Sequence, residues 1–209
     1  MRATMQTALV RGVEGRAVEV QVDISQGVTG FFLVGLATGS AKEAKERVRS
    51  AIRAAGLPFP HNRLTVNLAP AELRKDGSGL DLAVAAGICL AQLGLRAPDG
   101  AAFLGELALD GGVRHVDGVL VLARWLASRG IRTLFVPEAD AAEAALGQGP
   151  TILPCPDLGS VMAHLTGEAP LTAHSGRLPA PVTREPEWDL AEVQGQEAAR
   201  RALEVAAGG

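Results

Sequence analysis

Alternation between apolar and polar residues marks the first strands of the chain. In A-V-E-V-Q-V-D-I, residues 17–24, every second side chain is apolar, which is typical of a strand with one buried face. R-L-T-V-N-L at residues 63–68 alternates in the same way, and F-F-L-V-G-L at 31–36 is a short apolar run. The pattern therefore predicts strands over residues 3–36 and another strand at 63–68.

Apolar residues at helical spacing predict two helices among these strands. The first covers residues 40–55, and the Ser40 hydroxyl and Glu43 carboxylate have the spacing of a capping box at its start. The second covers residues 80–93 and is apolar nearly all round, so it should be a buried central helix. Asp81 is expected to interact with the free N–H groups in the first turn of that helix.

Strands and helices then alternate up to residue 166. We expect strands at residues 103–109, 131–136 and 151–153, and helices at 117–129, 138–146 and 157–165. Antiparallel strands followed by a β-α-β-α order indicate an α+β (mixed α/β) domain that fills residues 1–166.

The composition changes after this domain. Residues 167–187 hold several prolines and few large apolar side chains, so they are interpreted as a linker. Ordered structure is expected again in residues 188–209, with a helix at 196–207. A single helix cannot bury its own apolar face, which indicates the first element of a further domain.

Composition excludes several classes of protein. The chain has 209 residues, is 47% hydrophobic and carries a net charge of -3, so nothing global suggests a nucleic-acid coat or a membrane protein.

Cys89 and Cys155 lie in apolar segments and are predicted to be free, buried thiols. We expect a cytoplasmic protein, and no metal site, because no Cys or His residues have metal-ligand spacing.

The loop K-D-G-S-G, residues 75–79, has three interpretations. It can be a tight turn that caps the next helix, a ligand contact through N–H groups, or a site with Ser78 as nucleophile. A nucleophilic serine needs a base. Lys75 is expected to be exposed and charged, which makes it a poor base, and no carboxylate is evident that would orient His115.

Basic residues are concentrated between residues 42 and 75. Eight lysines and arginines stand there against three glutamates, although the chain as a whole is acidic. The stretch is either a solvated helix face with pairs such as Glu43–Arg47, a surface for DNA phosphates, or an interface with another subunit. The eight basic residues are Lys42, Lys45, Arg47, Arg49, Arg53, Arg63, Arg74 and Lys75.

Several motifs together resemble the N-terminal domain of the ComM/YifB family of Mg-chelatase-like AAA+ ATPases. They are V-G-L-A-T-G-S-A-K-E-A-K-E-R-V-R-S-A-I, N-L-A-P-A-E-L-R-K-D-G-S-G-L-D-L-A-V-A-A-G, F-L-G-E-L-A-L-D-G-G-V-R, R-T-L-F-V-P-E-A-D and D-L-A-E-V-Q-G-Q-E-A-A-R-R-A-L-E-V-A-A-G-G. The resemblance implies a Lon-protease-like accessory domain of the ribosomal-protein-S5-type two-layer superfamily. It also implies that residues 188–209 start an AAA+ ATPase domain that is truncated in this chain.

The Lon proteolytic motif K-D-G-P-S-A-G is only partly retained here. Laid on this chain, its serine position falls on Gly79, Ser78 replaces the proline, and the lysine position falls on Leu120. The resemblance therefore implies that the Ser-Lys dyad is lost and that the domain has no peptidase chemistry. The degenerate loop consists of Lys75, Asp76, Gly77, Ser78 and Gly79.

The motor of the family is also incomplete in this sequence. Its phosphate-binding loop, G-x-x-x-x-G-K-[ST], follows the A-A-G-G segment in relatives, and this chain contains no match. The chain is therefore expected to bind no cofactor and to hydrolyse no ATP, although Val193, Gly195 and Gln196 match positions near the adenine in an intact motor.

For the intact protein the resemblance implies a hexameric helicase that uses ATP and Mg. It would migrate DNA branches during natural transformation, with branched or single-stranded DNA as its partner and no contact with a membrane. Two alternatives remain from other classes: a Lon-like peptidase that uses Ser78, and a Mg-chelatase-type subunit that inserts a metal.

Overall fold

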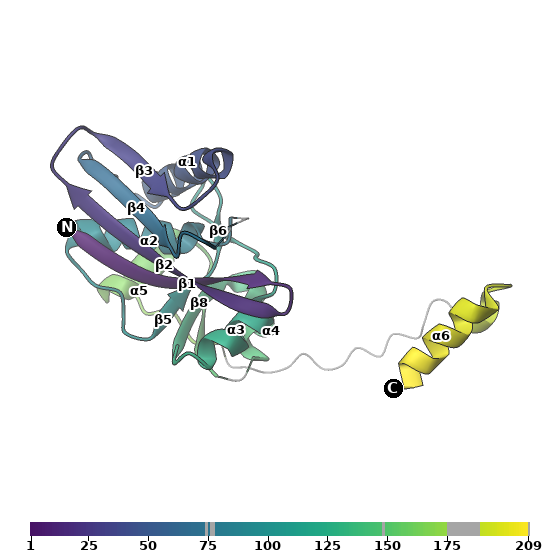
Figure 1. Cartoon of the computed structure of the whole chain (residues 1–209). Helices are drawn as coiled ribbons and strands as arrows, with labels where there is room; N and C mark the ends of the chain where they lie inside the picture. The colour runs from purple at the N-terminus through teal and green to yellow at the C-terminus, as the bar shows by residue number, and fades with distance from the viewer. Residues whose placement is uncertain (74, 76–77, 148, 175–188, 209) are drawn as a thin grey trace. The chain divides into compact units, whose positions relative to one another are not determined.

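The structure, a computed structural model, describes residues 1–73, 75, 78–147, 149–174 and 189–208 (Figure 1). The chain forms two compact units, Met1–Arg177 and Leu178–Gly209. Most of the segment interpreted as a linker, residues 167–187, lies outside the described residues.

The first unit is a mixed α/β domain around a seven-stranded sheet. The strands lie in the order β3-β4-β2-β1-β5-β8-β9, and four of the six pairings are parallel. The strands are β1 (Arg2–Arg11), β2 (Glu14–Ser25), β3 (Gly30–Val34), β4 (Arg63–Ala69), β5 (Ala101–Phe103), β8 (Thr133–Pro137) and β9 (Thr151–Cys155). The short strands β6 (Glu106–Leu107) and β7 (Val113–Arg114) form a separate antiparallel pair.

Helices cover the sheet on two faces (Figure 1). The larger core includes buried residues of α1 (Thr38–Ala54), α2 (Asp81–Leu93) and α5 (Leu158–Thr166). The smaller core includes α3 (Val119–Ala127) and α4 (Ala141–Ala145), which follows a 3-10 turn at Glu138–Asp140. In β8, Phe135 enters the first core while Leu134 and Val136 enter the second, as alternation along a strand requires.

The central helix forms as the sequence predicts. Every residue of α2 from Asp81 to Ala91 is buried, and Gly94 ends the helix in the left-handed conformation. Asp81 does not cap the helix, however. Its carboxylate accepts hydrogen bonds from Arg47 and from the Leu107 N–H, because those partners meet it inside the core.

Two other local predictions are wrong. Helix α1 begins at Thr38 after Ala37, and no side chain caps it, so Ser40 and Glu43 do not form a capping box. The Ala41 N–H bonds to the Ala37 carbonyl, which places Ser40 already inside the first turn. The strand expected over residues 103–109 is divided into β5 and β6.

The two edges of the large sheet differ. The chain after α5 returns to β9, where the His174 N–H donates to the Ile152 carbonyl oxygen at 2.8 Å. At the other end of the strand order, β3 pairs with β4 alone among the described strands.

The second unit holds a 3-10 turn at Leu190–Glu192 and helix α6 (Glu197–Gly208). Asp189 caps the turn by accepting from the Ala191 N–H at 2.9 Å. Neither of these two elements buries a residue. Across the described residues, no helix combines the length and apolar character that a bilayer crossing needs.

Candidate functional site

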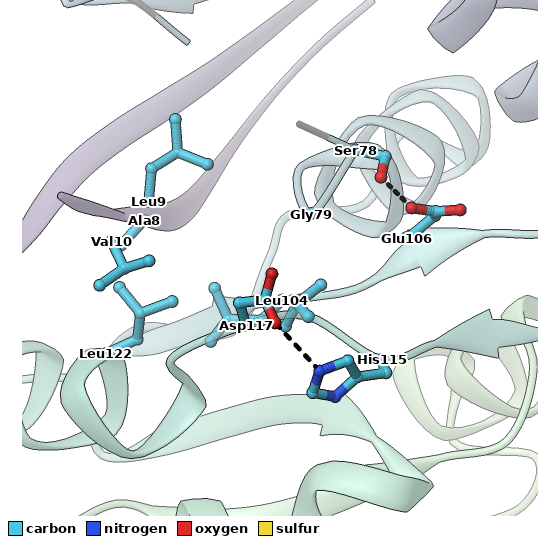
Figure 2. A pocket seen from close by; sticks show the side chains of 11 residues that line it. Ala8, Leu9, Val10, Ser78, Gly79, Leu104, Glu106, His115, Asp117 and Leu122 are labelled. Atoms are coloured by element: carbon cyan, nitrogen blue, oxygen red, sulfur yellow. Dashed lines mark hydrogen bonds and ion pairs between the residues drawn. The ribbon is translucent and has the colours of Figure 1, made fainter. Parts of the chain in front are cut away.

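A cavity of about 220 Å³ is lined in part by Ser78 and Gly79, the last two residues of the K-D-G-S-G motif (Figure 2). Apolar side chains of β1, α3 and the end of β5 form part of its wall, including Val10, Leu104 and Leu122. Four polar residues complete the lining, namely Ser78, Glu106, His115 and Asp117. The structure therefore places Ser78 and His115, which are 37 positions apart in the sequence, at one cavity.

Ser78 uses its hydroxyl to donate a hydrogen bond to the Glu106 carboxylate (Figure 2). Glu106 is the first residue of β6 and follows Gly105 in the sequence. The Gly105 N–H donates a hydrogen bond to the Gly79 carbonyl oxygen at 3.0 Å. These contacts join the serine turn to the start of β6. The sequence prediction missed Glu106, although it stands in the G-E-L-A-L motif.

Lys75 is buried, which contradicts the expectation that it is exposed. Its ammonium group donates to the Pro70 carbonyl oxygen at 2.5 Å and to the Leu73 carbonyl oxygen at 3.0 Å. Burial lowers the pKa of Lys75 by removing water from the charged group. The expectation failed because the ammonium group bonds to the Pro70 and Leu73 carbonyl oxygens, and the sequence alone does not reveal that contact.

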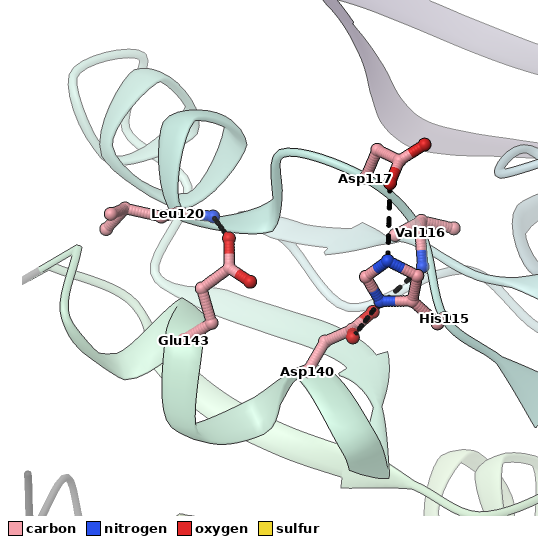
Figure 3. A network of polar contacts seen from close by, with 6 residues as sticks. All are labelled: His115, Val116, Asp117, Leu120, Asp140 and Glu143. Carbon is pink, nitrogen blue, oxygen red and sulfur yellow. Dashed lines mark hydrogen bonds and ion pairs between the residues drawn. The ribbon is translucent and has the colours of Figure 1, made fainter. Parts of the chain in front are cut away.

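His115 has the orienting carboxylate that the sequence did not reveal (Figure 3). Its Nδ1 lies 2.5 Å from Asp140 Oδ1, and its Nε2 lies 3.3 Å from Asp117 Oδ1. Asp140 is buried and also accepts from the Val116 N–H at 2.9 Å. The hydrogen bond that Asp140 accepts from the His115 ring, followed by the negative charge of Asp140, raises the pKa of His115.

Leu120 occupies the first turn of α3, at the position that the resemblance assigns to a lost lysine. Its N–H donates to Glu143 Oε1 at 3.1 Å (Figure 3). Leu122, and not Leu120, lines the cavity. Of the degenerate loop, Ser78 and Gly79 line the cavity, while Asp76 and Gly77 lie outside the described residues.

Three of the basic residues are engaged by acidic or aromatic side chains. Arg47 forms an ion pair with the buried Asp81, with 2.6 Å between Nε and Oδ2. Its ion-pair partner is therefore Asp81 and not Glu43, the partner expected for a solvated helix face. Arg49 pairs with Glu46 at 3.2 Å and lies over the Phe59 ring, and Arg63 lies 4.9 Å from the centroid of the Phe32 ring.

Lys42 and Arg53 remain exposed on α1, with Lys45 half-buried beside them. Arg74 lies outside the described residues. The basic surface of α1 is therefore smaller than the sequence suggests.

The three residues matched to an adenine site belong to the second unit. Val193 is exposed, and its carbonyl oxygen accepts from Arg200 Nη1 at 3.2 Å. Gly195 and Gln196 follow with positive φ angles of 72° and 56°, in the turn before α6.

Neither cysteine lines the cavity. Cys89 and Cys155 are free, buried thiols, as predicted, and burial raises the pKa of each to about 12. Within the described residues, no group of three His, Cys, Asp or Glu side chains is arranged to hold a metal ion.

Comparison with known proteins identifies the family. Residues 20–140, more than half of the chain, match the family described as subunit ChlI of Mg-chelatase. An uncharacterized protein of Mycobacterium tuberculosis is 40% identical over 205 residues, which is 96% of this chain and 40% of that protein. The uncharacterized protein YifB of Escherichia coli is 37% identical over 210 residues, 98% of this chain and 40% of that protein.

A third relative has a named role. The competence protein ComM of Haemophilus influenzae is 37% identical over 210 residues, 95% of this chain and 40% of that protein. The chain thus spans about two fifths of the length of the curated relatives it matches. By the family match and these relatives, the chain is a member of the ComM/YifB family, within the Mg-chelatase ChlI group.

Proposed function

We propose that the chain is the non-catalytic N-terminal accessory domain of a ComM-like, Mg-chelatase-related AAA+ ATPase, and that it has the Lon-protease-like fold. The observation that carries the proposal is the pairing of Ser78 with Glu106. A carboxylate is a far weaker base than a neutral amine or imidazole, so this pairing does not supply the amine base that a Lon-type Ser-Lys dyad uses. Lys75, the nearest amine in the sequence, is instead engaged by two backbone carbonyls.

The whole protein would act on DNA. We propose a hexameric, ATP-dependent helicase that migrates DNA branches, with ATP and Mg bound by a motor beyond this segment. The identity to a competence protein supports a role in the uptake or recombination of DNA. The exposed basic residues of α1 would contact phosphates in that assembly.

The test uses the intact protein that contains this segment. We expect it to hydrolyse ATP and move a four-way DNA junction, and Ser78→Ala to leave both rates unchanged. The 209-residue chain alone should show no ATP hydrolysis. An intact protein that hydrolyses no ATP and moves no junction would overturn the proposed motor.

A Lon-like peptidase is the second candidate, because His115 and Asp140 resemble a base with its orienting carboxylate. His115 also lines the same cavity as Ser78. A fluorophosphonate distinguishes the two functions: a nucleophilic serine is labelled, and labelling is lost in Ser78→Ala and His115→Ala. We expect no labelling above the level of Ser78→Ala.

A further inference from the structure

The His115 ring lies between two carboxylates that come from different segments of the chain (Figure 3). Its Nδ1 lies 2.5 Å from Asp140 Oδ1, and its Nε2 lies 3.3 Å from Asp117 Oδ1. An ionised carboxylate only accepts hydrogen bonds, so each contact needs a proton on the ring nitrogen. A neutral imidazole carries one N–H and an imidazolium carries two. Both hydrogen bonds together therefore require the doubly protonated ring.

The two carboxylates differ in burial, and this difference decides which contact survives when the ring loses a proton. The Asp140 side chain is 3% exposed, whereas the Asp117 side chain is 98% exposed. A buried carboxylate that loses its donor has no water to replace it, while an exposed carboxylate is solvated again at little cost. The neutral ring should therefore keep its proton on Nδ1, toward Asp140, and present a bare Nε2 to Asp117.

The main chain on both sides of Asp117 is held in place. On one side, the Val116 N–H donates to Asp140 Oδ2 at 2.9 Å. On the other side, Gly118 has a φ angle of 72° and lies so close to β1 that a Cβ atom there would meet the Val10 side chain at 3.2 Å. Loss of the Nε2 proton can therefore free the Asp117 side chain while the loop keeps its position.

The elements that pack against β7 bring few other charges to His115. Glu106 of β6 lines the same cavity, but its carboxylate accepts from Ser78. Arg114 precedes the histidine and is exposed, and Glu138 begins the neighbouring 3-10 turn. Strand β8 contributes no titratable side chain. In the described chain, only the two aspartates are hydrogen-bonded to the ring through charged groups.

We infer that His115 is a pH-sensitive clasp at the cavity. The doubly protonated ring holds the Asp117 carboxylate on Nε2, and the singly protonated ring releases it while keeping Asp140 on Nδ1. His115 and Asp117 both line the cavity together with Ser78, so release removes a fixed carboxylate from its wall. The charge and the opening of the cavity therefore follow the pH.

The pH at which the clasp acts is set by its two carboxylates. The hydrogen bond to Asp140, followed by the charge of Asp140, raises the pKa of His115. The ring therefore loses its second proton above about pH 6.5, the ordinary pKa of a histidine. This clasp goes beyond the proposed function, because it depends neither on a motor nor on DNA.

NMR of the 209-residue chain tests the clasp. Nitrogen-15 shifts of the histidine rings identify the nitrogen that loses its proton, and we expect Nε2 at His115. The couplings between Hα and the Hβ atoms of Asp117 report its χ1 rotamer. We expect one rotamer below the midpoint of the His115 titration and averaging between rotamers above it.

Asp117→Asn separates the clasp from a general loosening of the loop. An amide can accept from the imidazolium and donate to the neutral ring, so the couplings at this position should stay the same throughout the titration. Averaging at high pH in this variant would count against the ring as the cause.

Two histidine variants complete the test. His115→Gln should abolish the transition at Asp117, and His61→Gln, at an exposed histidine, should leave it unchanged. Asp117 couplings that are equal at both ends of the titration, a proton lost from Nδ1, or a transition that persists in His115→Gln would each overturn the inference.

Discussion

Arg47 Nε lies 2.6 Å from Asp81 Oδ2, which joins helix α1 to the first residue of the central helix α2. The side chain of Asp81 is 4% exposed and that of Arg47 is 23% exposed. Asp81 also accepts from the Leu107 N–H at 3.4 Å. One carboxylate therefore holds together three segments of the chain that lie next to the serine loop.

Loss of Arg47 should strongly destabilise the domain. Arg47→Ala leaves the Asp81 carboxylate buried without its cation, which typically costs about 3 kcal/mol or more of unfolding free energy. Urea denaturation of the 209-residue chain measures the change. Arg53→Ala, at an exposed arginine of the same helix, should change the unfolding free energy by less than about 0.5 kcal/mol. Equal losses in the two variants would show that the ion pair is not important for stability.

Lys75 should be structural. Lys75→Met keeps the length of the side chain but removes the donor to the Pro70 and Leu73 carbonyl oxygens, and we expect a loss of about 1–3 kcal/mol in unfolding free energy. Lys42→Met makes the same change at an exposed lysine and should have little effect. A stable Lys75→Met variant would mean that water replaces the ammonium group at no cost.

His115 should make stability depend on pH near neutrality. Its pKa in the folded state lies above the unfolded value because Asp140 favours the imidazolium. The stabilisation is therefore complete below the unfolded pKa of about 6.5 and is lost as pH rises through the folded pKa. Urea midpoints should fall as pH rises above the unfolded pKa of about 6.5, and this fall should be smaller in His115→Gln. His61→Gln, at an exposed histidine, should retain the whole fall.

Charge reversal on α1 should weaken DNA binding by the intact protein. The variant carries Lys42→Glu, Lys45→Glu and Arg53→Glu, and it spares Arg47 because that residue supports the fold. For each phosphate that the variant no longer neutralises, the slope of log K against log salt should decrease in magnitude by about 0.9 for duplex DNA. A variant with the same charge change at the exposed residues Arg16, Arg114 and Arg124 is the control. Identical slopes in the two variants would exclude α1 as the DNA surface.

The periodic segments were predictable because the spacing of their apolar residues reflects which face of each strand or helix is buried. The alternation in β2 and the all-apolar composition of α2 reflect faces that the sheet and the helices cover. The start of α1 was not predictable from Ser40 and Glu43, because tertiary packing of its apolar face sets where the helix begins.

Polar partners that are distant in sequence were beyond prediction. Arg47 and Asp81 are 34 positions apart, and His115 and Asp140 are 25 apart. From the sequence alone, Arg47 is expected to pair with Glu43, because the two residues are four positions apart. The packing of α1 on α2 instead brings Arg47 to the buried Asp81. The contacts of Ser78 and Lys75 likewise became visible only once the fold was known.

The two outer strands of the large sheet differ in how readily they can accept a further strand. At β9, Pro154 has no N–H to donate, and the Ile152 carbonyl oxygen already accepts from the His174 N–H. A strand added to the sheet of the described residues would therefore join at β3, so the sheet can be extended in one direction more easily than in the other.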